Sequence, residues 1–371
     1  MAEQGKASRQ FSVEYRQYLD EQGRPLGPLP PASSESGLLL NAYRNMVLTR
    51  ALDKKAVALQ RTGQMGTYAA ALGQEAIGTA IGYAMDADDV FVPAYRDQAA
   101  QIIRGVKPEE ILAFWGGSER GSDFQGPPRR DLPNCIPVAT QISHAAGVAT
   151  ALKLRHPGQV VVASCGDGAT SRGDFYEGLN VAGVWQLPLI LVINNNQWAI
   201  SVRRQYQSAS ASLAQKAIAA GIPGVQVDGN DFIAVHDALT VALERARKGK
   251  GATLIETVSY RLCDHTTADD ATRYRSADEL NDAWAREPVK RLQSCLHASQ
   301  LWDAEQEQAL QASCRQQVDE AAQDFLSREP EAPHSMFRYL YAEWPASYGY
   351  QQQLLEEKLA RQNQEGQQHE H

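Results

Sequence analysis

Two uninterrupted apolar segments, separated by one helix-length segment, constrain the fold of this chain more than any other feature of its sequence. The apolar segments are Gln159–Ser164 and Leu189–Ile193, and between them Asp174–Gln186 has apolar residues at helical spacing. A strand, a helix and a strand within about 35 residues form a βαβ unit, and continuous apolar strands are typical of a parallel sheet covered on both faces. We therefore predict an α/β chain with a mostly parallel sheet flanked by helices.

Similar patterns extend over most of the remaining chain. Helices are predicted over Leu38–Thr62, Ala76–Ala84, Pro108–Trp115, Ala145–Leu154 and Ala234–Arg247, and further strands over Val225–Asp228 and Thr253–Tyr260. Residues 277–330 are helical and charged, and Gln351–His371 is expected to be a solvated helix with a frayed end. We divide the chain into an extended, Gly- and Pro-rich arm at 1–35, one α/β domain at 36–330 and a partly helical C-terminal extension at 331–371.

Charge and cysteine content argue against several classes of protein. The 371 residues contain 36 Lys and Arg against 44 Asp and Glu, a net charge of −8, whereas general nucleic-acid binders are usually basic. No apolar run approaches the ~18–20 residues that cross a membrane, and Met1–Phe11 is too polar for a secretory signal. The five cysteines are scattered without a CxxC pair, which suggests neither a zinc site nor disulfides. We expect a cytoplasmic protein that binds neither nucleic acid nor membrane, or a mitochondrial matrix protein if a leader has been removed.

Polar residues follow both strands of the βαβ unit. Gly166-Asp167-Gly168 follows the first strand, and Asn194-Asn195-Asn196 follows the second. Because the carboxyl ends of parallel strands share one edge of the sheet, we expect Asp167 and Asn196 to meet there. Carboxylate, amide and main-chain oxygens suit a hard cation such as Mg²⁺.

This pattern differs from the glycine-rich fingerprint of dinucleotide-binding folds. Gly166–Ser171 has no third glycine or alanine at the expected position, and an unneutralised Asp167 would repel a phosphate. A metal ion that bridges carboxylate and phosphate removes this repulsion, so the spacing favours a magnesium–diphosphate site. A turn aspartate that caps a helix, followed by a turn of asparagines, remains an alternative on spacing alone.

A family resemblance is carried by residues 165–201, CGDGATSRGDFYEGLNVAGVWQLPLILVINNNQWAIS. This segment resembles the thiamine diphosphate motif of the alpha subunits of 2-oxo acid dehydrogenases, the decarboxylating first components of the pyruvate and branched-chain complexes. Other segments resemble the same family in the same order, over about residues 38–330. The resemblance implies a thiamine-diphosphate-binding fold and a thiamine-diphosphate-dependent oxidoreductase.

The resemblance also implies which residues hold the cofactor and its metal. Asp167, Asn196 and the main-chain carbonyl of Trp198 match the magnesium ligands, and Asn194 stands where some members have an arginine. The remaining cofactor contacts correspond to Tyr95, Arg96, Ile136, Val138, Gly168, Ala169 and Arg261. Branched-chain members also bind K⁺, whose ligands would match Pro137, Thr140 and Gln141, but Cys135 replaces a serine ligand.

The catalytic histidine of the family corresponds to His265, and Arg261, Asp269, Tyr274 and Arg275 match the hydrogen-bond network of its loop. An imidazole exchanges protons near neutral pH, and the carboxylate of Asp264 is expected to favour the protonated form of His265. Thr266 stands where some eukaryotic members carry a phosphorylated serine, although nothing in the sequence indicates a kinase. Tyr68 is expected to face the 2-oxo acid pocket.

The implied reaction is oxidative decarboxylation of a small 2-oxo acid, most simply pyruvate, with transfer of the acyl group to the lipoyl arm of a transacylase. The family's activating glutamate comes from a separate beta subunit, and no glutamate of this chain matches it, so we expect an α₂β₂ heterotetramer. A branched-chain 2-oxo acid dehydrogenase or acetoin dehydrogenase alpha subunit is the nearest alternative. A nucleotide-dependent Rossmann enzyme and a noncatalytic assembly subunit are more distant ones.

Overall fold

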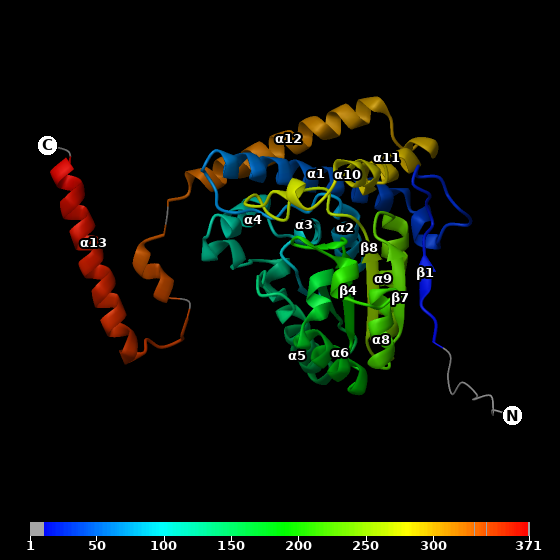
Figure 1. The fold of residues 1–371 in the computed structure, drawn as a ribbon, viewed down its shortest axis with the longest axis horizontal. Coiled ribbons are helices and arrows are strands. Elements are labelled where there is room, and N and C mark those ends of the chain that lie inside the picture. Colours follow the sequence, from blue (N-terminus) through cyan, green and yellow to red (C-terminus); the bar gives the residue numbers. More distant parts are fainter. Residues whose placement is uncertain (1–10, 330, 339, 370–371) are drawn as a thin grey trace. The chain divides into compact units, whose positions relative to one another are not determined.

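The structure is a computed structural model that describes residues 11–329, 331–338 and 340–369 (Figure 1). The chain forms two compact units, the first ending at Leu326 and the second beginning at Ser327. No helix in the described ranges is both long enough and apolar enough to cross a membrane.

A six-stranded, all-parallel sheet lies at the centre of the first unit, in the order β1-β7-β8-β4-β3-β2. Its strands are β1 (Glu14–Arg16), β2 (Val90–Val92), β3 (Val161–Gly166), β4 (Leu189–Asn195), β7 (Gly224–Asp228) and β8 (Thr253–Val258). The register pairs Gly166 at the end of β3 with Asn194 near the end of β4. The α/β prediction is confirmed, and the two strand ends adjoin as expected.

Helices surround this sheet, and some of them pack on its two faces. They are α1 (Ser36–Arg61), α2 (Glu75–Ala84), α3 (Gln98–Arg104), α4 (Pro108–Trp115), α5 (Thr140–Arg155), α6 (Gly173–Val184), α7 (Arg204–Gln207), α8 (Lys216–Ala219), α9 (Phe232–Arg247), α10 (Ala277–Trp284), α11 (Pro288–Ala298) and α12 (Ala304–Ser327). A short antiparallel hairpin, β5 (Trp198–Ala199) and β6 (Val202–Arg203), follows β4 directly.

The core divides according to strand alternation, since successive strand residues face opposite sides of a sheet. Val162, Ile190 and Val192 belong to the apolar cluster under α1, α2, α9 and α11, whereas Val161 and Leu191 belong to the cluster under α5, α6 and α8. A third cluster joins the second half of α1 to α4 and α12. The strands are therefore buried on both faces, as their continuous apolar sequences predicted.

The N-terminal arm is partly integrated into this unit. Residues of β1 pair in parallel with β7, beginning with Glu14 opposite Val225, and Leu19 is buried in the core. The sequence analysis did not predict β1, β2 or α3, nor the short elements β5, β6, α7 and α8. β1 and β2 have three residues each, which is too few to show a periodic pattern of apolar residues.

The second unit contains α13 (Gly349–His369), which matches the helix predicted over Gln351–His371 in its described part. Before it lie two short 3₁₀ helices, Pro333–Phe337 and Ala346–Tyr348. The ring of Phe337 packs edge-on against Trp344 at 5.3 Å between centroids.

Candidate active site

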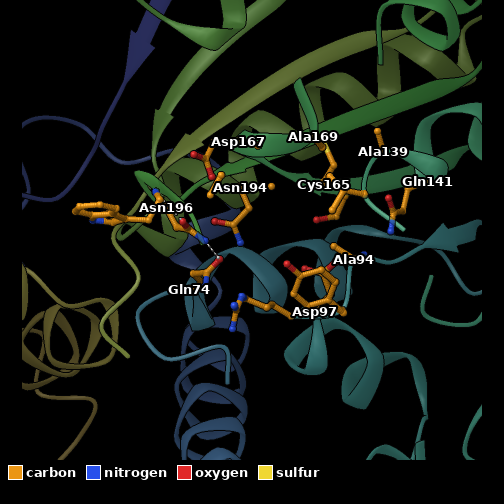
Figure 2. Close-up of a pocket in the computed structure, with 18 of the residues that line it drawn as sticks. Gln74, Ala94, Asp97, Ala139, Gln141, Cys165, Asp167, Ala169, Asn194 and Asn196 are labelled. Carbon is orange, nitrogen blue, oxygen red and sulfur yellow. Dashed lines mark hydrogen bonds between the residues drawn. The ribbon is translucent and has the colours of Figure 1, made fainter. Parts of the chain in front are cut away.

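A cavity of about 250 Å³ lies at the carboxyl ends of β3 and β4 (Figure 2). Asp167, Asn194 and Asn196 project from the strand ends, and Gln74 faces Asn196 from the start of α2. Asp97 closes another side of the cavity. This is the edge where ligands of open α/β folds bind.

The carboxyl group of Asp167 is only 2% exposed. Burial raises its pKa to about 6, and its Oδ2 accepts a hydrogen bond from Gln207 Nε2 at 3.0 Å. No lysine or arginine forms an ion pair with it among the residues that the structure describes. A buried carboxylate in this position is electrostatically suited to a bound cation.

The neighbouring oxygens complete a donor set suited to a hard cation. Asn196 donates from Nδ2 to Gln74 Oε1 at 3.3 Å, and its Oδ1 accepts from the Trp198 N–H at 3.1 Å. The Trp198 carbonyl accepts from Arg261 Nη1 at 3.3 Å. Within the described ranges no group of three or more His, Cys, Asp or Glu side chains gathers as a metal cluster, so an ion here would use one carboxylate with amide and main-chain oxygens. Such mixed oxygen ligation fits Mg²⁺, which retains water and phosphate ligands.

Two further features of the cavity wall fit a polar cofactor. The Nε2 atom of Gln74 is buried and has no hydrogen-bond partner among the described residues, so it can donate to a ligand. At Gly168, a Cβ atom would lie 2.7 Å from the Cβ of Ala199. Only glycine therefore lets the turn after β3 approach the β5–β6 hairpin this closely.

Arg96 and His265 form the second part of the cavity wall. Arg96 Nη2 lies 3.0 Å from His265 Nδ1 and also donates to the His265 carbonyl, while Nη1 donates to Ala70 O at 2.7 Å. Arg261 Nη1 lies 3.4 Å from the same Nδ1. The ring of Tyr95 stands edge-on to the imidazole at 6.3 Å.

These neighbours determine the protonation state of His265. Burial is the largest cause, followed by the charges of Arg96 and Arg261, and together they lower its pKa to about 4; only Asp269 opposes them. Both guanidinium groups point N–H donors at Nδ1, so the neutral ring carries its proton on Nε2. His265 is therefore a neutral imidazole at physiological pH.

The expectation that Asp264 favours the protonated form of His265 is wrong. The Asp264 carboxylate turns away and accepts from the Ala271 N–H at 3.0 Å. Asp269 is the acid beside the loop: its Oδ2 accepts from the His265 N–H at 2.8 Å and from the Tyr274 hydroxyl. The fold of the loop, rather than adjacency in the sequence, decides which carboxylate contacts His265.

The cavity brings together most of the predicted site residues, but not all of them. It is lined by Tyr95, Arg96, Val138, Asp167, Gly168, Ala169, Asn196, Trp198 and His265. Arg261 is fully buried behind His265, and Ile136 lies outside the lining with 49% of its surface exposed. Tyr68 instead lines a separate cavity of about 820 Å³ between α1 and residues 262–280.

The segment matched to K⁺ ligands folds back on itself. Gln141 Nε2 donates to the Cys135 carbonyl at 2.7 Å, and the Thr140 N–H approaches the Pro137 carbonyl at 3.4 Å. Ala139 between them has φ 76°, which gives the turn its shape.

Sequence reasoning missed Gln74, Asp97 and Gln207 as residues of this site. Asp97 is buried beside the cavity, where burial raises its pKa to about 7 and its carboxylate accepts from the Ala94 N–H at 2.7 Å. Gln207 lies 40 positions from the Asp167 it contacts. Sequence spacing does not indicate that Asp97 or Gln207 belongs to the site. Asp97 does, however, directly follow the Tyr95–Arg96 pair, which the sequence indicates.

The geometry is that of an α/β enzyme that binds a cofactor at the carboxyl edge of a parallel sheet. Comparison with known families extends this class assignment: the model of the dehydrogenase E1 component family matches residues 43–334. The chain belongs to the dehydrogenase E1 component family.

Curated relatives support this membership over nearly the full chain. The pyruvate dehydrogenase E1 component subunit alpha of Mycoplasma pneumoniae is 38% identical over 88% of this chain and 90% of its own length. The protein of the same name from Mycoplasma genitalium is 37% identical, covering 91% and 94%. That from Staphylococcus aureus is 38% identical, covering 94% of both chains.

Proposed function

We propose that this chain is the alpha subunit of a pyruvate dehydrogenase and that, together with a beta subunit, it catalyses thiamine-diphosphate-dependent oxidative decarboxylation. The observation that carries the proposal is the single cavity in which Asp167 and Asn196 share a wall with the Arg96–His265 pair. The relatives named as pyruvate dehydrogenase alpha subunits, at 37–38% identity, support pyruvate as the substrate.

The cofactor and its metal ion would occupy the polar part of this cavity. Asp167, Asn196 and the Trp198 carbonyl would hold Mg²⁺, and the ion would neutralise the buried carboxylate as well as the diphosphate. Tyr95 and Arg96 would bind the diphosphate, for which a guanidinium fork is suited. When bound, thiamine diphosphate supplies a ring that accepts the electron pair released by decarboxylation.

Further contacts would come from main-chain and apolar groups around the cavity. Gly168 and Ala169 allow the diphosphate to approach the backbone after β3. Val138 lines the cavity and Ile136 is exposed nearby in sequence, so together they could support the other end of the cofactor. Arg261 contacts the Trp198 carbonyl and His265 Nδ1, and would orient a metal ligand and the histidine together.

His265 would hold a proton at Nε2 and present it to the reacting atoms. The two arginines occupy Nδ1, which leaves the Nε2–H free to donate a hydrogen bond to a reacting atom and to stabilise negative charge that develops there. Its low pKa suits it to act as a hydrogen-bond donor without carrying charge. Residues on both sides of His265, including Asp264 and Thr266, line the larger cavity beside Tyr68, where we place the approach of the 2-oxo acid.

The proposed assembly is an α₂β₂ heterotetramer that transfers its acyl group to a lipoyl-bearing transacylase. The support is the relatives' name, subunit alpha, together with the absence from this chain of a glutamate matched to the family's activating residue. We also propose a K⁺ ion near Pro137, Thr140 and Gln141 as an optional part of the site. No observation favours a branched-chain or acetoin-type substrate over pyruvate.

The test is reconstitution of the chain with its beta subunit. Carbon dioxide release from pyruvate should require both thiamine diphosphate and Mg²⁺, and should exceed the release from 3-methyl-2-oxobutanoate. Preference for the branched substrate would leave the cofactor assignment intact and overturn the substrate. Turnover without thiamine diphosphate would overturn the proposed function.

A further inference from the structure

Residues 68–72, here the 68–72 segment, form an irregular stretch between α1 and α2 that holds the loop carrying His265. The Tyr68 carbonyl accepts from the Thr267 N–H at 2.9 Å, and the Thr267 hydroxyl accepts from the Tyr68 N–H at 3.0 Å. At the other end, the Leu72 carbonyl accepts from the Leu262 N–H at 3.1 Å. The loop is therefore attached to the segment on both sides of His265.

The same segment also holds the residues that begin α3. The Ala70 carbonyl accepts from Arg96 Nη1 at 2.7 Å, and the Ala69 carbonyl accepts from Gln98 Nε2 at 2.9 Å. Arg96 thus binds the segment through Nη1 and contacts His265 through Nη2. The position of the segment determines where both partners of the Arg96–His265 pair lie.

One buried side chain anchors the segment from α1. Asp53 Oδ1 accepts from the Tyr68 hydroxyl at 2.7 Å, and Oδ2 accepts from the Ala71 N–H at 2.8 Å. The carboxyl group is 3% exposed and forms no ion pair among the described residues. Burial raises its pKa to about 7. An apolar residue could fill this position of α1 without the free-energy cost of burying a carboxyl group. The two hydrogen bonds that Asp53 accepts therefore explain why an acid is found here.

We propose that Asp53 is a positioning residue of the active site: by fixing the 68–72 segment, it holds Arg96 and His265 in contact. That the Arg96–His265 contact matters for catalysis rests on the proposed function; that Asp53 maintains the contact does not. Asp53 itself lines the larger cavity rather than the one beside Asp167, so it acts through the segment.

The rival explanation is that Asp53 only stabilises the fold, and Asp231 provides a matched control. Asp231 is also buried, also has a pKa raised by burial, and accepts main-chain N–H groups of Tyr18 and Leu19 at 2.7 Å each. It lies at the start of α9 and lines neither of the two cavities. Asp53→Asn and Asp231→Asn therefore make the same chemical change in two buried anchors.

Hydrogen–deuterium exchange of the full chain, assembled with its beta subunit, separates the two explanations. In Asp53→Asn, amides within 262–275 should exchange at least about tenfold faster, because the segment that binds the loop has lost an anchor. The kcat of lipoyl acylation should fall about tenfold, with the Kd for thiamine diphosphate changed less than about threefold. Asp231→Asn should accelerate exchange near residues 15–20 and leave 262–275 unchanged.

Exchange at 262–275 that stays within about twofold of wild type in Asp53→Asn would overturn the proposal, as would equal acceleration in Asp231→Asn. If Asp53→Asn fails to fold, Tyr68→Phe removes one of the two hydrogen bonds and keeps the buried ring; unchanged loop exchange there would also overturn it. The exchange measurement needs no turnover. A wild-type complex that lacks thiamine-dependent activity would thus refute the proposed function and leave the result for Asp53 standing.

Discussion

Arg96 and His265 are 169 positions apart in the sequence, yet Arg96 Nη2 lies 3.0 Å from His265 Nδ1 and also contacts the His265 carbonyl oxygen. The cation therefore faces the nitrogen at which the imidazole would gain a second proton. Arg261 approaches the same nitrogen from 3.4 Å. The arrangement keeps the ring neutral and fixes its tautomer, which gives the arginine a role besides the phosphate binding that we propose.

Arg96→Gln should raise the pKa of His265 from about 4 toward its ordinary 6.5, because a positive neighbour that opposes protonation is removed. Burial and Arg261 remain in the variant, so its activity should fall on acidification at a higher pH than that of wild type, while the wild-type rate shows no inflection from His265 between pH 5 and 8. The pH profile of lipoyl acylation is the measurement. Arg155→Gln, on the exposed end of α5, should retain the wild-type profile. Identical profiles for Arg96→Gln and wild type would contradict the role given to Arg96.

His265→Ala should spare cofactor binding and reduce lipoyl acylation by about 10²–10³-fold, the usual effect of losing a hydrogen bond to charge that develops in the transition state. Decarboxylation measured with an artificial oxidant should fall much less, because His265 belongs to the loop and not to the proposed metal ligands. His297→Ala, on α11, serves as the control. Equal lipoyl-dependent rates for His265→Ala and wild type would refute the role of the histidine.

Asp167→Asn should abolish Mg²⁺-dependent binding of thiamine diphosphate and stabilise the metal-free chain at neutral pH. The folded-state pKa is about 6, above the ordinary 3.8, so the cost to the fold builds up as pH rises from about 3.8 to about 6 and is complete above 6. The neutral amide removes roughly 1–3 kcal/mol of this cost at pH 7, and the gain should vanish below about pH 4. Calorimetric titration and thermal unfolding test the two effects, with Asp174→Asn as an exposed control. Unchanged cofactor affinity would exclude Asp167 as a metal ligand.

Gly168→Ala should weaken cofactor binding by about tenfold or more, because its Cβ would lie 2.7 Å from the Cβ of Ala199 and displace the β5–β6 hairpin. Gly147→Ala provides the comparison, since nothing lies within 4 Å of a Cβ there and the residue is helical. That change should stabilise the chain by about 0.5–1 kcal/mol without altering affinity. If both variants bind alike, the close approach at Gly168 is not needed.

The chain without its beta subunit should be inactive. In the assembly that we propose, the carboxylate that activates the cofactor comes from the beta subunit. Carbon dioxide release from pyruvate should be negligible for the chain alone with thiamine diphosphate and Mg²⁺, and should appear when the beta subunit is added. Substantial turnover by the chain alone would overturn the divided site.

The sequence was informative where a feature depends on long periodic segments or on strand ends. The strands ending near Asp167 and Asn196 were predictable because their apolar runs are continuous and buried on both faces. The position of the site, at the carboxyl edge of the sheet, followed from the prediction that the strands are parallel. Elements of three residues, such as β1 and β2, gave no pattern, since their pairing rather than their composition makes them strands.

Side-chain contacts within irregular segments were not predictable in the same way. Asp264 and Asp269 are equally plausible neighbours of His265 by sequence, and only the turn of the loop selects Asp269. The link between Asp53 and Tyr68 spans 15 positions with no repeating pattern. Such contacts depend on the path of an irregular segment through the fold. The secondary-structure propensity of its residues does not determine that path.

Strand β1 protects one edge of the sheet, because it covers the main-chain groups of β7 that would otherwise face solvent. A shortened chain that begins after Leu19 would expose this edge as a template for pairing with other copies. Such a chain would be prone to aggregate during expression even though every residue of the cavity is retained. An affinity tag placed before residue 11 extends the chain ahead of β1 and keeps that strand, so it is the safer choice for producing the protein.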